Sequence, residues 1–228
     1  MKTMIAAIAI AMLLAATIVG QTKPNFQQSQ KQNSIALKRY EWKSRTQIQK
    51  DGETKNEQLA LMSYDAEGNL QKTLIASSPE PNLPEHGLRG LIAKNKKKDF
   101  MRKIEDLRSL ATAYRELTPD KFEGFLASAK VTPEEKLVRM QGYNVLQAGD
   151  SMIMWFDPVS RRQRRVEIQT ALDEKPVQII SEFQDIAQGG PTFMARNLLN
   201  YAGTSLVIIT QNFDYTLSKS NETAVRNR

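Results

Sequence analysis

The second half of the chain is interrupted by short turns at nearly regular intervals, and this spacing is what most limits the folds open to it. No helix-length segment is left between the turns, so parallel strands would have no room for their crossovers. The pattern therefore predicts consecutive antiparallel hairpins. Candidate strands fall near residues 137–147, 151–157, 163–172, 176–186, 191–201 and 204–217.

A second group of strands precedes a helical region. Between residues 39 and 48, Tyr40 and Trp42 share one face while charged residues share the other, which is typical of a half-buried strand. Asp51-Gly52 provides the positive φ angles of a tight hairpin turn. Further strands are expected near residues 54–65 and 70–76.

Beyond a proline-rich stretch the apolar period lengthens to that of a helix. Phe100, Ile104 and Leu107 begin an apolar stripe that predicts a helix of roughly 15 to 20 residues. Thr118-Pro119 is typical of the start of a second, short helix. Thr132-Pro133-Glu134-Glu135 matches a capping box and predicts a brief third one.

This order of strands, helices and strands predicts an α+β fold. The apolar face of the sheet and the apolar stripes of the helices must cover each other, so the helices belong on one face. We expect a strongly curved antiparallel β-sheet, an incomplete barrel of about nine strands, because wide sheets coil under their own twist. Two or three helices, inserted after the third strand, are expected on its concave face.

The ends of the chain differ from this central region. Residues 1–20 combine Lys2 with an apolar run and predict a cleaved signal peptide, with a retained anchor as the alternative. Residues 21–34 and 218–228 are polar and are predicted to be flexible, which leaves residues 35–217 as a single domain. The chain contains no cysteine, so a bacterial lipoprotein, which needs an acylated cysteine, is not expected.

Three features resemble the LolA/LolB superfamily of periplasmic lipoprotein carriers and outer-membrane lipoprotein-sorting proteins. They are the signal peptide, the run from Met152 to Pro158 with the basic strand that follows it, and the closing strand that ends in Asn212-Phe213-Asp214-Tyr215. The resemblance covers residues 35–217. It implies a periplasmic, non-enzymatic protein without a cofactor, whose incomplete barrel encloses a hydrophobic cavity for acyl chains.

Residues that could carry out catalysis are few. The single histidine, His86, lies in a proline-rich loop with no orienting partner in the sequence, and no pattern predicts a metal site. We therefore predict no catalytic residue. The net charge of +7 favours anionic partners, but nucleic acid is not expected outside the cell.

Two groups of residues are candidates for binding. An apolar pocket is predicted from Met and aromatic side chains on the sheet, with core filling as the alternative. An anionic membrane surface or an envelope protein is predicted to meet a basic cluster, whose alternative role is to keep a sheet edge soluble. The pocket residues are Tyr40, Trp42, Met152, Met154, Phe156, Phe183 and Phe193, and the basic cluster is Arg161, Arg162, Arg164 and Arg165.

Together these observations predict an exported periplasmic binding protein that holds a lipid or a lipoprotein acyl chain between sheet and helices. The alternative is an envelope-assembly protein of the same fold that binds another protein. A secreted hydrolase is a third possibility. A hydrophobic cavity would favour the carrier, whereas a filled core with an exposed apolar patch would favour the interaction protein.

Overall fold

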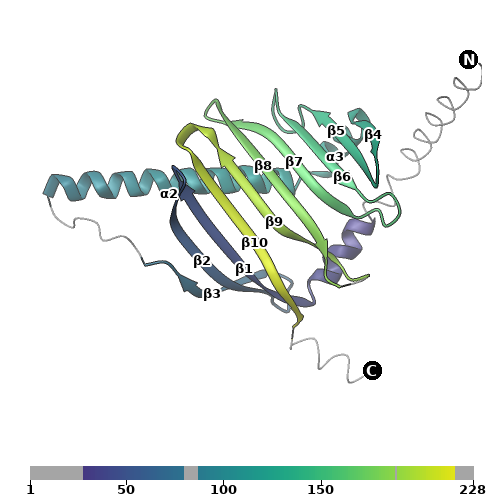
Figure 1. The fold of residues 1–228 in the computed structure, drawn as a ribbon, viewed down its shortest axis with the longest axis horizontal. Helices are drawn as coiled ribbons and strands as arrows, with labels where there is room; N and C mark the ends of the chain where they lie inside the picture. Colours follow the sequence, from purple (N-terminus) through teal and green to yellow (C-terminus); the bar gives the residue numbers. More distant parts are fainter. Residues whose placement is uncertain (1–27, 80–86, 188, 219–228) are drawn as a thin grey trace, which may run out of the picture.

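The computed structural model describes residues 28–79, 87–187 and 189–218, in which one ten-stranded antiparallel sheet carries its helices on one face (Figure 1). The spatial order of the strands is β3-β2-β1-β10-β9-β8-β7-β6-β5-β4. The strands are β1 (Tyr40–Lys50), β2 (Glu53–Tyr64), β3 (Leu70–Ser77), β4 (Lys130–Glu134), β5 (Leu137–Tyr143), β6 (Ser151–Phe156), β7 (Gln163–Leu172), β8 (Lys175–Asp185), β9 (Thr192–Tyr201) and β10 (Leu206–Leu217).

This architecture confirms the predicted α+β class and the open, curved antiparallel sheet. The hairpin turns form where turn residues were recognised: Asp51 and Gly52 both adopt positive φ, at 54° and 81°. The first and last strands, β1 and β10, pair in the middle of the sheet. The two edges are therefore β3 and β4.

Two helices connect these two edges across the concave face. Helix α2 (Gly87–Arg115) is followed by α3 (Pro119–Ser128). With 29 residues, α2 is ~43 Å long. A flat sheet of ten strands lying side by side would have roughly the same width. Because the sheet is curved, the direct distance between its edges is shorter, and the beginning of α2 extends past β3 (Figure 1).

The hydrophobic core lies between α2, α3 and the strands opposite them. Ile104 and Leu107 of α2 are fully buried, and Phe125 of α3 is 3% exposed. A Cβ at Gly142 in β5 would stand 2.6 Å from the Phe125 ring, so only glycine lets α3 approach this closely. Further core residues from the sheet are Met152, Met154, Phe156, Val166, Ile168, Val177, Ile179, Leu199, Leu206 and Ile208.

Asp150 ties the end of α2 to the connection between β5 and β6. The residue is 1% exposed, and its carboxylate accepts hydrogen bonds from the backbone amides of Val145, Leu146 and Gln147 at 2.6–2.9 Å. The hydroxyl of Tyr114 donates a further bond to it at 2.5 Å. Burial would raise the pKa of Asp150, but these hydrogen bonds outweigh burial and hold the pKa below its usual value.

Two local predictions were wrong: α2 has 29 residues where 15 to 20 were predicted, and the predicted third helix does not form. The capping-box pattern Thr132-Pro133-Glu134-Glu135 starts no helix, because Lys130–Glu134 forms the edge strand β4, and Glu135 (φ 38°) turns the chain into β5. The polar stretch predicted to be flexible is helical wherever it is described, since residues 28–37 form a helix. We call this helix the strap helix.

Three features singled out from the sequence fall on residues that the structure does not describe. The predicted signal peptide, residues 1–20, and the predicted C-terminal tail beyond Ser218 lie outside the described residues, as does His86. Within the described ranges, no helix has both the length and the apolar character needed to cross a membrane.

Candidate ligand-binding cleft

Two adjoining cavities open between the concave face of the sheet and its helices. The larger, of about 840 Å³, lies between the strap helix and strands β1, β2, β9 and β10. The smaller, of about 530 Å³, lies between strands β6 to β9 and the helical region from Ala111 to Phe122. Both are lined by Phe183 and Met194, so the two cavities adjoin at these side chains, and we call them together the cleft.

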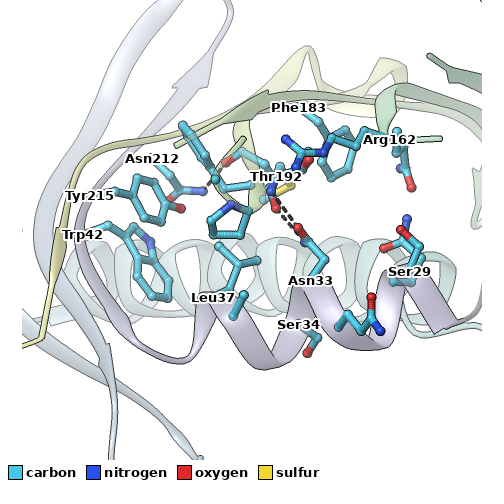
Figure 2. Close-up of a pocket in the computed structure, with 18 of the residues that line it drawn as sticks. Ser29, Asn33, Ser34, Leu37, Trp42, Arg162, Phe183, Thr192, Asn212 and Tyr215 are labelled. Atoms are coloured by element: carbon cyan, nitrogen blue, oxygen red, sulfur yellow. Dashed lines mark hydrogen bonds between the residues drawn. The ribbon is translucent and has the colours of Figure 1, made fainter. Parts of the chain in front are cut away.

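The larger cavity has an aromatic wall, and we call it the aromatic cavity. Trp42 stacks on Tyr215 with ring centroids 5.3 Å apart and planes 8° from parallel. Phe193 lies 4.1 Å from Tyr215 on the other side, and Tyr64 lies 5.8 Å from Trp42. Four rings from four strands therefore make one apolar surface that faces the cavity. Figure 2 shows two of them, Trp42 and Tyr215, side by side.

Tyr215 reaches this wall because β10 contains a bulge. The pairing of β1 with β10 shifts register between Glu41 and Lys43, and Asp214 opposite adopts a φ of 54°. An extra residue in one strand re-aims the side chains that follow it. Burial raises the pKa of Tyr215 and of Tyr64, so both hydroxyls remain neutral at physiological pH.

The smaller cavity is lined mainly by aliphatic and thioether side chains, and we call it the aliphatic cavity. Ala111 and Leu117 border it from the helical side. Its polar members include Ser181 and Asn197, which are hydrogen-bonded to each other at 3.1 Å and so need no ligand as partner. The apolar residues contributed by the sheet are Met152, Met154, Val166, Ile168, Ile179, Phe183 and Met194.

The strap helix closes one side of the aromatic cavity and is fastened there by a side chain. Nδ2 of Asn33 donates to the carbonyl oxygen of Thr192 at 2.7 Å, and the Thr192 amide donates to Oδ1 of Asn33 at 2.6 Å. Figure 2 shows Asn33 and Leu37 pointing from the helix toward the sheet. The Thr192 hydroxyl in turn donates to Asp185 at 2.7 Å.

Cations border the aromatic cavity at two places. Arg115, at the end of α2, contacts Glu116 at 3.1 Å and lies close enough to Tyr64 to oppose the rise in its pKa. Arg161 and Arg162 lie in the turn between β6 and β7. Arg161 is exposed and has no ion-pair partner among the described residues.

The structure divides the predicted pocket residues among three environments. Trp42, Phe183 and Phe193 line the aromatic cavity, and Met152, Met154 and again Phe183 line the aliphatic cavity. Tyr40 and Phe156 line neither: Phe156 is 8% exposed in the core, and Tyr40 begins β1 opposite Leu217. Tyr64, Met194 and Tyr215 were missed. Tyr64 had a sequence signal, because it shares a strand face with Met62.

The predicted basic cluster is also divided. Arg162 and Arg164 both pair with Asp185, at 3.0 and 3.1 Å. Burial would raise the pKa of Asp185, but its bonds with Arg164 and Thr192 prevail and lower it. Arg165 points to the other face of the sheet, where its guanidinium lies 5.5 Å from the ring of Trp155.

Comparison with known proteins adds a distant likeness to a solved structure. No protein-family model and no curated protein matches the chain. Among solved structures, a LolA superfamily protein from Nitrosomonas europaea is similar over 82% of this chain and 91% of its own, with 10% sequence identity and a TM-score of 0.34. At these values of identity and TM-score, the likeness identifies no shared functional residue.

Proposed function

We propose that the protein is an exported, non-enzymatic binding protein that holds the acyl chain of a lipid or lipoprotein in the cleft. The observation that carries this proposal is the aliphatic cavity, with its lining of Met, Ile and Val side chains beneath the helices. Its volume of about 530 Å³ is within the usual range for small-molecule sites, which is roughly 300–1,000 Å³.

The chemistry of the lining supports an aliphatic ligand. Each buried CH₂ group contributes ~0.8 kcal/mol, so a chain can be held without specific polar contacts. Met152, Met154 and Met194 have flexible thioethers that adapt to ligands of different shape. The aromatic cavity continues the cleft toward Arg115 and Arg161, where the polar end of an amphiphile would find cations.

Export to the periplasm is the second part of the proposal. It rests on residues 1–20, whose single lysine and apolar run are typical of a signal peptide. Fractionation of cells that produce the tagged protein should release a mature form, shortened by about 20 residues, with the periplasmic contents. Recovery of the unshortened chain in the cytoplasm would contradict it.

Ligand binding can be tested with a variant that fills the aliphatic cavity. Ala111 lines this cavity from α2, and Ala111→Trp should occupy the space of the acyl chain. Native mass spectrometry of the unmodified protein should detect co-purified lipid, and the variant should lose it. Ala127→Trp, on the exposed side of α3, is the matched control and should retain it.

One observation favours the alternative, an envelope-assembly protein. Every residue of the edge strand β3 is exposed, including Leu70, Leu74 and Ile75, each about half exposed. An unpaired apolar edge can accept a strand from a partner. If no lipid co-purifies and a fluorescent fatty acid does not bind, the carrier proposal is wrong and this alternative gains support.

A further inference from the structure

In the first half of α2, the side chains of residues 92 and 94–99 are exposed to solvent. The contribution of α2 to the hydrophobic core begins at Phe100, which packs against the buried cluster. Before it, Ile92 and all of residues 94–99 are exposed. Figure 1 shows this end of α2 extending beyond β3. We call residues 92–98 the basic overhang.

The basic overhang has a sequence that does not favour an isolated helix. Lys94, Lys96, Lys97 and Lys98 lie within five positions, and the first turn of α2 contains no acidic residue. Like charges three or four residues apart on a helix repel, as Lys94 does with Lys97 and Lys98. Neither packing nor helix stability therefore explains why Lys94, Lys96 and Lys98 are there.

The lysines surround the helix instead of forming a stripe. Successive residues are rotated by about 100° around the axis, so Lys94 and Lys98 lie on one side and Lys96 on the opposite one. Asp99 is the one carboxylate from residue 92 to 104, and it contacts Arg102 at 3.1 Å. The overhang therefore presents an almost entirely positive surface beside the exposed aliphatic side chain of Ile92 (54%).

We propose that the basic overhang docks the protein on an anionic membrane surface. Lysine is depleted in protein–protein interfaces, whereas clustered lysines with an apolar neighbour are attracted to anionic lipid headgroups. The basic cluster at residues 161–165 is less suited to this role, because Arg162 and Arg164 are already paired with Asp185. On the overhang, Lys94, Lys96 and Lys98 belong to none of the ion pairs found among the described residues.

A single helix, α2, connects the basic overhang to the cleft. The same helix continues to Ala111, Tyr114 and Arg115, which line the aliphatic cavity. Docking would thus place one end of α2 at the lipid surface and the other at the cleft. The membrane contact itself does not depend on what the cleft holds.

The test is binding to vesicles of defined composition. The purified protein is mixed with vesicles of phosphatidylcholine containing about a third phosphatidylglycerol, or with pure phosphatidylcholine, and the bound fraction is measured by sedimentation. We expect binding to the anionic vesicles only, weakening as salt screens the charges. Lys94→Gln, Lys96→Gln and Lys98→Gln together should weaken it at least about tenfold.

A matched triple variant controls for net charge. Lys121, Lys130 and Lys136 are exposed and lie on α3, β4 and the turn after β4, at the opposite edge of the sheet. Their replacement by Gln removes the same charge and should reduce binding less than about threefold. Equal losses in both variants, or equal binding to neutral vesicles, would overturn the proposal. So would binding of polyglutamate in preference to vesicles, which would indicate an acidic protein partner.

Discussion

At the scale of single residues, Asp150 joins the end of α2 to the connection between β5 and β6. Its carboxylate satisfies three backbone amides and the hydroxyl of Tyr114 in an almost fully buried position. We expect Asp150→Ala to lower the free energy of unfolding by about 3 kcal/mol, because these donors lose their acceptor. Urea denaturation measures the change. Asp157→Ala removes a far more exposed turn carboxylate and should cost less; equal losses would contradict this role for Asp150.

The same carboxylate should make stability depend on pH. The pKa of Asp150 is lowered in the folded protein from its usual 3.8. A depressed pKa means that its contribution is fully present above about pH 4 and is lost as the pH falls through the folded-state value. Denaturation should show similar stability at pH 7 and pH 5 and lower stability at pH 3, with a smaller loss at pH 3 in Asp150→Asn. Asp185 also has a lowered pKa, so the variant should not be fully insensitive to pH.

Individual cleft residues were predictable only where strand alternation decided their direction. Met152 and Met154 alternate with Ile153 along β6, and the pattern correctly places them on the buried face. Tyr215 was not predicted, because its direction depends on the bulge at Asp214. Phe156 has the same alternation as Met154 and is similarly buried, but only Met154 lines the aliphatic cavity, a difference that the packing of the helices determines.

At the scale of elements, the strap helix depends on few contacts with the sheet. The paired hydrogen bonds between Asn33 and Thr192 fasten it beside the aromatic cavity. We expect Asn33→Ala to increase amide hydrogen exchange in residues 28–37 and to speed ligand release, because the helix opens more often. Lys31→Ala, at an exposed position of the same helix, should leave both unchanged. Unaltered exchange in Asn33→Ala would contradict the fastening role.

Elements with a strong periodic pattern were predicted well, and those stabilised by distant contacts were not. The strands from 163 to 217 follow their turns closely, because each hairpin is a local structure. The strap helix is polar in sequence, and its attachment requires Thr192, far away in the chain. The pattern at Thr132-Pro133 is compatible with a helix, but pairing with β5 makes it a strand.

At the scale of the whole molecule, the open edge at β3 is a liability. Its exposed side chains include Leu74 and Ile75 beside unpaired backbone groups. We expect Ile75→Lys to reduce self-association at high concentration, with little change in thermal stability, because charges on edge strands oppose pairing between sheets. Light scattering measures this. Val159→Lys, in an exposed turn, is the control; an equal reduction there would indicate a general effect of charge.

The fold class followed from the order of the segments, since strands joined by short turns must form antiparallel hairpins. The extent of the cleft did not follow. Sequence patterns show which side chains face the helices, but not whether the helices pack closely against them. The helices pack tightly at Leu107 and leave space at Ala111, and both residues belong to one apolar stripe of α2.

The two tryptophans of the chain lie on opposite faces of the sheet. Trp42 lines the aromatic cavity, whereas Trp155 lies outside, between the guanidinium groups of Arg139 and Arg165, with its indole nitrogen donating to Glu134. A Trp155→Phe protein would retain a single tryptophan, Trp42, which lines the aromatic cavity and can be excited selectively over the tyrosines. Its emission would shift to shorter wavelength when a ligand displaces water from the cavity. Ligand binding could therefore be measured without an added dye.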